Sequence, residues 1–324
     1  KRPSTRSTLR ALGQVEAYLA AEMAQELTVR VVAAQRIDPG RGEEQIGALL
    51  ARRERVRGRR VRSDAIKIFL DGEIDKHTAA VLDPYEGAAG VRGNLLIKPE
   101  ALNALVRRAD ADGFLIHMHA MGDRAVRAGL DAIEQAIRVN GARDRRHQLA
   151  HVGVVSPDDL GRFGRLGVAA NFQPLWAQRN DAASGPTEAA LGPERSRWIL
   201  PMASIAATGG RIIASSDWPS PSMNPLDAMQ VALTRRPLDG SKPAQQPEER
   251  LGLPAILAAY TIEAAWAARE EEIDGSIAIG KAADLAVLDG NLFETDPGKL
   301  HDVRVLLTLL DGEPVYRDPS FAWH

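Results

Sequence analysis

Residues 114–141 read FLIHMHAMGDRAVRAGLDAIEQAIRVNG, a short apolar stretch that passes directly into a longer amphipathic one. Residues 114–120 have the length and composition of a buried strand, in which side chains alternate between two faces, so His117 and His119 point to the same side. The remainder repeats apolar residues at helical spacing up to Gly141, with Asp123 available to cap its start. The stretch therefore predicts a strand–helix unit with a histidine pair near the end of its strand.

The same unit recurs along the chain. Further strands are predicted at 27–35, 64–72, 146–152, 168–174 and 211–219. Further helices are predicted at 6–28, 46–56, 98–113, 156–167, 196–209, 224–236 and 251–270. Strands that alternate with helices of about 10–15 residues are typical of a parallel α/β sheet.

The pattern changes near residue 273. The segments GSIAIGKAADLAVLDG (275–290) and DVRVLLTLLDGEPVYR (302–317) contain short apolar runs separated by Gly and Asp-Gly, which favours β-hairpins. We therefore expect two parts, an α/β unit over 1–272 and a small all-β unit over 273–324.

The charge balance excludes some kinds of partner. With 41 basic and 43 acidic residues the net charge is −2, which gives no electrostatic reason to bind nucleic acid or an anionic membrane. The one dense basic run, RRERVRGRRVR at 52–62, lacks interleaved aromatic residues and is interpreted as a solvated helix end or loop. No transmembrane stretch and no signal peptide is recognisable. We expect a cytoplasmic protein with a small-molecule substrate and, since dimers are the commonest assembly, a possible homodimer.

Polar residues lie in or directly after five successive predicted strands. These residues are Lys67, His119, His151, Gln173 and Asp217. Because the carboxyl ends of parallel strands meet at one edge, the five side chains are expected near one another. The chain has no cysteine, so a metal ion there could be held only by His, Asp, Glu or a modified Lys.

Each of these residues also has a structural interpretation. A strand histidine is often a hydrogen-bonded core residue, Lys67 could extend its amine out of the sheet, and Asp217 could cap the next segment. The other histidines are interpreted as structural, loop or tail residues: His77, His147, His301 and His324. The convergence of Lys67, His119, His151 and Asp217 on one edge favours a metal site.

The ordered set of motifs resembles the amidohydrolase superfamily, and within it the YtcJ-like branch that includes N-substituted formamide deformylases. The motifs are IKIFLDG, HMHAMGDRAV, HQLAHVGVVSPDDL and ASSDWPS…NPL, with a tail similar to the segment that enters the small β-sandwich of that superfamily. The resemblance implies a (β/α)8 TIM-type barrel with a small C-terminal β-sandwich segment, one or two divalent metal ions with zinc first among them, and hydrolysis of amide-like C–N bonds.

The resemblance also implies roles for single residues. Lys67 matches a lysine that is carboxylated in many members, and His119 and His151 match ligands on the fifth and sixth strands. Asp217 matches the eighth-strand aspartate that binds metal or activates water. Three further residues stand where substrate-pocket residues are expected: Gln173, Trp176 and Trp218. His117 has no matching role and is interpreted as a bystander.

One element of the resemblance is missing. The superfamily has a His-x-His pair on its first barrel strand, whereas no histidine precedes Lys67 here. We therefore expect either a part of a longer enzyme that lacks the first strands of the barrel or a homologue with an impaired metal site. The first is favoured, because an open barrel exposes strand edges.

The resemblance thus predicts a metal-dependent hydrolase that cleaves a small N-acyl or N-formyl substrate with metal-activated water, Asp217 moving the proton. Two alternatives stay open: a deaminase on the same scaffold, and a catalytically impaired homologue with a regulatory or binding role. Lys67 argues against the deaminase, because deaminases of this superfamily usually lack the carboxylated lysine.

Overall fold

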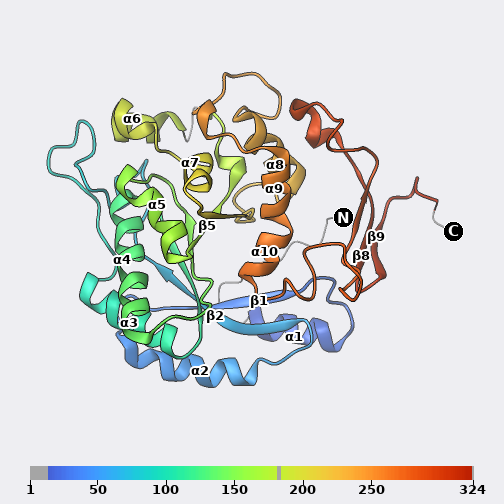
Figure 1. The fold of residues 1–324 in the computed structure, drawn as a ribbon, viewed down its shortest axis with the longest axis horizontal. Coiled ribbons are helices and arrows are strands. Elements are labelled where there is room, and N and C mark those ends of the chain that lie inside the picture. The colour runs from blue at the N-terminus through green and yellow to red at the C-terminus, as the bar shows by residue number, and fades with distance from the viewer. Residues whose placement is uncertain (1–13, 181–183, 323–324) are drawn as a thin grey trace.

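A parallel sheet with its strands in chain order organises the molecule (Figure 1). The computed structural model describes residues 14–180 and 184–322, and within them six strands pair in the order β1 to β6. Their bounds are β1 Val31–Arg36, β2 Val61–Phe69, β3 Leu115–Ala120, β4 Gln148–His151, β5 Ala169–Phe172 and β6 Arg211–Ala214. Sequential order with parallel pairing is the arrangement of a barrel-type α/β sheet.

Helices precede and follow these strands along the described part of the chain. Their bounds are α1 Gln14–Met23, α2 Ile46–Arg55, α3 Pro99–Ala111, α4 Asp123–Asn140, α5 Pro157–Leu166, α6 Ser184–Ser196, α7 Met202–Ala207, α8 Pro225–Thr234, α9 Leu253–Tyr260 and α10 Ile262–Ala267. No helix in the described part of the chain is long and apolar enough to span a membrane.

The two faces of the sheet differ in chemistry. One face presents Ile66, Ile116 and Leu149 to the main apolar core, which it shares with buried side chains of α3, α4 and α5. The opposite face carries Lys67, His117 and His119, since alternate side chains of a strand point in opposite directions. Burial of the apolar residues on one face thus determines that Lys67, His117 and His119 lie on the opposite face.

Several helices differ from the sequence prediction. Of the helix expected at 6–28, residues 6–13 lie outside the described residues and the described part ends at Met23. The helix expected at 196–209 is only Met202–Ala207, and the one expected at 251–270 is two helices, α9 and α10, that meet at Thr261. Helix α6 was not predicted, because its sequence contains Gly192 at φ 74° and Pro193, which interrupt the helical pattern.

A small antiparallel sheet follows, as the hairpin pattern predicts. Within the described residues it consists of β7 Ala286–Leu288, β8 Val305–Leu310 and β9 Glu313–Arg317. Its turn residue Asp311 accepts hydrogen bonds from three arginines, Arg30, Arg59 and Arg60, which flank β1 and β2. Arginines of the basic run 52–62 therefore attach this sheet to the large one. The boundary at residue 273 remains a prediction.

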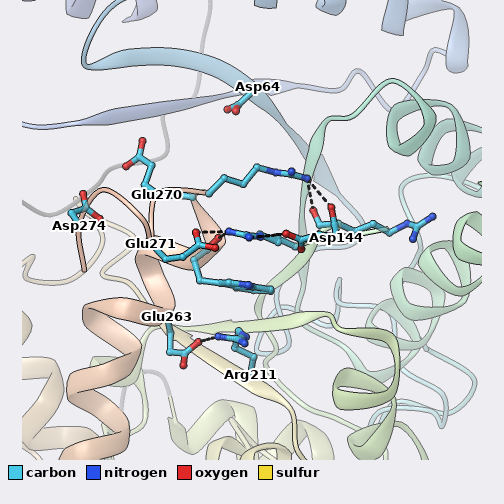
Figure 2. A network of polar contacts seen from close by, with 12 residues as sticks. Asp64, Asp144, Arg211, Glu263, Glu270, Glu271 and Asp274 are labelled. Carbon is cyan, nitrogen blue, oxygen red and sulfur yellow. Dashed lines mark hydrogen bonds and ion pairs between the residues drawn. The ribbon is translucent and has the colours of Figure 1, made fainter. Parts of the chain in front are cut away.

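A second polar network joins the amino-terminal ends of the strands to α10 (Figure 2). Trp266 of α10 lies under two guanidinium groups, with Arg211 at 4.0 Å and Arg146 at 5.2 Å from the ring centroid. Arg211 pairs with Glu263, and Arg146 pairs with Glu271 at 2.5 Å. In barrel folds this end of the sheet serves stability, whereas sites form at the opposite end.

Near the same end, several hydrogen-bond donors surround one buried carboxylate. Asp110 at the end of α3 has its side chain 1% exposed and lies 2.9 Å from Arg145, 2.7 Å from Arg143 and 3.0 Å from His147 Nε2. These hydrogen bonds outweigh burial and hold the pKa of Asp110 well below its usual range. His147 is fully buried, and burial lowers its pKa. His147 is therefore structural, as predicted.

Asp110→Asn should lower the free energy of unfolding by about 3 kcal/mol at pH 7, because it leaves the buried guanidinium group of Arg145 without its partner. A carboxylate with a lowered pKa stabilises the fold above its unfolded pKa of about 4, and the contribution is lost as pH falls toward the folded value. The difference between wild type and variant should thus shrink below about pH 4 in urea unfolding.

Asp112→Asn is the matched control. Asp112 pairs with Arg108 at 2.6 Å on the surface of the same helix end, so its loss should cost less than about 1 kcal/mol. Equal effects of the two substitutions, or an Asp110 effect that does not change with pH, would contradict this account.

Candidate active site

The register of β2 and β3 places two predicted site residues, Lys67 and His119, on neighbouring strands. Lys67 of β2 is the direct neighbour of His117 in β3, and Phe69 is the neighbour of His119. Lys67 Nζ lies 3.1 Å from His117 Nε2, and the ring of Phe69 lies 5.3 Å from that of His119. His117, interpreted as a bystander from the sequence, therefore contacts the lysine of the candidate site.

His119 and His151 form the centre of the site. Their rings are 4.6 Å apart in an edge-to-face arrangement, and both residues are buried, at 5% and 3% exposure. Trp176 stacks on His151, with 5.4 Å between ring centroids and 11° between ring planes. Two buried imidazoles from adjacent strands and one half-buried tryptophan thus form a single cluster.

His151 reaches this cluster through an unusual backbone conformation. By alternation its side chain would follow Leu149 toward the helices, because His151 pairs in register with Ala120 rather than His119. Its φ of 74° lies in the left-handed region, as does that of Val152 at 50°. Such a conformation costs a non-glycine residue about 1–3 kcal/mol, and here it coincides with placing the ring beside His119.

A chain of hydrogen bonds fixes which nitrogen of His151 carries the proton. Ser215 donates to Asn171 Oδ1 at 2.7 Å and accepts from Gln173 Nε2 at 2.8 Å. The amide oxygen of Gln173 therefore faces His151 Nδ1, at 2.8 Å, and accepts a hydrogen bond from it. With its proton on Nδ1, neutral His151 has its lone pair on Nε2, the form in which a histidine binds metal.

Asp71 is a residue of the site that the sequence analysis did not identify. Its buried carboxylate accepts hydrogen bonds from the backbone of Ala80, Met121 and Gly122, at 2.8–3.0 Å. Burial raises the pKa of Asp71 to about 7, although the three backbone donors act in the opposite direction. Its Oδ1 lies 3.6 Å from His119 Nε2. The only sequence signal was the dipeptide Asp-Gly, which was interpreted as a turn.

The long segment between β2 and α3, residues 70–98, is tied down beside the site. Asp123 accepts a hydrogen bond from the backbone of Leu82 at 2.8 Å, and Arg124 donates to the carbonyl of Gly93 at 2.8 Å. The prediction that Asp123 caps its own helix is wrong: Gly122 is the N-cap of α4, and Asp123 binds this segment instead. His77 of the segment stacks on Tyr85, with 4.4 Å between centroids.

Gly122 is required by the close approach of two backbones. A Cβ atom on Gly122 would lie 2.0 Å from the carbonyl oxygen of Ala80, closer than any real contact. The same approach lets Gly122 and Ala80 donate to one oxygen of Asp71.

Two predicted residues lie beyond the end of β6. Asp217 has a left-handed backbone, φ 54°, and is exposed, and Trp218 is 56% exposed. Their predicted roles, and those of Lys67, Gln173 and Trp176, remain predictions. His301 contacts Gln230 in α8, and His324 lies outside the described residues.

The cluster contains donor atoms of the kind that bind metal ions. Imidazole nitrogens are good zinc ligands, and a catalytic zinc takes three protein ligands. Within residues 14–180 and 184–322, no group of three or more His, Asp or Glu side chains is arranged to hold a metal ion. The donor chemistry of His119 and His151 therefore fits two positions of such a site.

A sequential parallel sheet with buried imidazoles at its carboxyl edge is the arrangement of barrel-type α/β proteins, in which sites form at that edge. The chain belongs to the amidohydrolase family, whose model (Amidohydrolase family, Amidohydro_3) matches residues 7–316. The predicted fold class and family are thus confirmed.

Curated relatives extend over much of the chain. The protein LONG AFTER FAR-RED 3 of Arabidopsis thaliana is 32% identical over 78% of this chain and 42% of its own length. YtcJ of Bacillus subtilis (strain 168) is 30% identical over 81% of this chain and 49% of its own. The N-substituted formamide deformylase of Arthrobacter pascens is 27% identical over 78% and 45%. The chain spans about half the length of these relatives.

Solved structures show the same fold. An uncharacterized metal-dependent hydrolase from Pyrococcus horikoshii OT3 superposes with a TM-score of 0.73 at 21% identity, over 91% of this chain and 56% of that one. An adenosine deaminase from Xanthomonas campestris with bound zinc gives 0.63 at 12% identity, over 97% and 66%.

Gly122→Ala should lower the free energy of unfolding by about 3 kcal/mol, because the added methyl group forces two backbones apart. Gly47→Ala is the matched control: Gly47 is exposed in α2 with no atom within 4 Å of the added Cβ, so alanine should leave stability unchanged or raise it. Urea unfolding measures both. An unaffected Gly122→Ala protein would contradict the proposed packing of the segment against the site.

Proposed function

We propose that this protein hydrolyses the C–N bond of a small N-acyl or N-formyl substrate at the His119–His151 cluster, with a bound divalent metal ion, zinc first among candidates. The observation that carries the proposal is the buried imidazole pair at the carboxyl edge of an amidohydrolase-family sheet. Relatives named as a deformylase and as a deaminase both act on C–N bonds, which supports the reaction class.

His119 and His151 would hold the metal through one nitrogen each, together with ligands beyond this pair. When bound, a metal of this kind polarises a carbonyl group and lowers the pKa of a water molecule to about 7. Lys67, in contact with His117, is the proposed carboxylated lysine of the site.

The chain's own residues would carry out the remaining tasks. Asp217 accepts the proton of the attacking water and delivers it to the leaving nitrogen, so that the C–N bond breaks to give a carboxylic acid and an amine. Trp176, stacked on His151, offers an apolar surface to the substituent on nitrogen, and Trp218 lies beyond β6 as a second such surface. Gln173 maintains the orientation of His151.

His119→Asn and His151→Asn should each weaken zinc binding at least tenfold, because each removes one imidazole ligand. Competition titration with a chromophoric chelator measures the affinity. His301→Asn is the control, since the ring of His301 contacts Gln230 of α8 and not the His119–His151 pair. Zinc affinity that is the same in all three variants would rule out a metal site at this cluster.

Asp217→Asn should lower kcat for an N-substituted formamide at least about a hundredfold, the usual contribution of a positioned general acid–base group, with zinc binding retained. Release of formate and amine from the zinc-loaded protein is measured. Asp227→Asn is the control, because Asp227 pairs with Asn224 at the start of α8.

Unchanged turnover in Asp217→Asn would contradict the assigned role. A wild-type protein that binds zinc but hydrolyses neither formamides nor other N-acyl amines would instead favour the regulatory alternative, and release of ammonia from an amino-substituted heterocycle would favour a deaminase.

A further inference from the structure

Asp71 occupies a position from which one carboxylate acts on two parts of the site. Its Oδ2 accepts from Ala80 in the segment after β2 and from Gly122 in the turn after β3, at 2.9 and 2.8 Å. Its Oδ1 accepts from Met121 at 3.0 Å and is also 3.6 Å from His119 Nε2. The carboxylate therefore holds two loops in place and borders the ring of His119 at the same time.

Two hydrogen-bond acceptors lie near His119 Nε2. Besides Asp71 Oδ1, the carbonyl oxygen of Gly72 lies 3.4 Å from this nitrogen. A nitrogen that faces two oxygen acceptors is the one that carries the proton in a neutral imidazole. The lone pair of His119 then lies on Nδ1, whereas that of His151 lies on Nε2 because Gln173 takes the proton of its Nδ1.

We propose that Asp71 is a positioning residue that sets the Nε2–H tautomer and the ring orientation of His119, while it fastens the segment 70–98 over the site. Partners of this kind fix which nitrogen of a histidine is offered to a metal, and their loss commonly weakens binding about 10–100-fold. The consequence of this role for metal binding rests on the proposed function. The tautomer of His119 does not, because it is a property of the chain itself.

Asp71→Asn gives a directional test. The amide oxygen of the variant is expected at the Oδ2 position, where two backbone N–H groups converge. The amide NH2 then lies at the Oδ1 position, where it faces His119 Nε2 and leaves the backbone N–H of Met121 without its acceptor. A donor in that place favours a lone pair on Nε2. The tautomer of His119 should therefore reverse to Nδ1–H.

Asp123→Asn is the matched control. Asp123 holds the same segment, through the backbone of Leu82, but its carboxylate is engaged with Leu82 and Arg124 rather than directed at His119. A merely structural role for Asp71 would make the two variants behave alike. A positioning role requires that only Asp71→Asn changes the histidine.

The tautomers are read from long-range 1H–15N NMR spectra of the metal-free protein with 15N-labelled histidine, at an alkaline pH where imidazole is neutral. His119 is assigned by its loss in His119→Asn. We expect Nε2–H in wild type and in Asp123→Asn, Nδ1–H in Asp71→Asn, and at least a tenfold loss of zinc affinity in Asp71→Asn alone.

An Nδ1–H tautomer of His119 in wild type would overturn the proposal, and this result is available even if Asp71→Asn does not fold. An unchanged tautomer in Asp71→Asn, or the same change in Asp123→Asn, would also overturn it. Absence of hydrolysis from a protein with the expected tautomers would count against the proposed function and leave the role of Asp71 intact.

Discussion

Parallel pairing of β2, β3 and β4 keeps their carboxyl ends level, and the candidate site depends on this constraint. Lys67 lies beside His117, and Phe69 lies beside His119. Alternate residues of β2 and β3 therefore form one patch, polar except for Phe69, on the face opposite the main apolar core. Burial of Ile66, Ile116 and Leu149 on the other face prevents a shift of one residue, because such a shift would turn the apolar side chains away from the helices.

The polar groups at the two ends of the sheet have different roles. At the amino-terminal ends, arginines pair with acidic residues and stack on Trp266, which attaches α10 to the strands. At the carboxyl ends, individual polar side chains instead organise the buried groups: Gln173 orients His151, and Asp71 accepts from three backbone N–H groups beside His119. The first arrangement joins elements, and the second leaves imidazole rings in defined orientations, as a catalytic site requires.

Much of this arrangement could be predicted from the sequence. The alternation of strands and helices placed His119 and His151 at one edge, and the structure places their rings 4.6 Å apart. The left-handed backbone of His151 could not be predicted, because strand periodicity directs that side chain to the opposite face. Asp71 was missed for a similar reason: its partners at Ala80 and Gly122 come from loops whose positions only the folded chain defines. Asp123 was assigned to its own helix, whereas its partner Leu82 is distant in sequence.

The central claim is that His119 and His151 present complementary nitrogens to one ion. Crystals of the protein soaked in zinc and measured at the zinc absorption edge test it most directly. The account predicts one anomalous peak about 2.0–2.1 Å from both His119 Nδ1 and His151 Nε2. A peak bound through His119 Nε2, or zinc sites that involve neither ring, would contradict it.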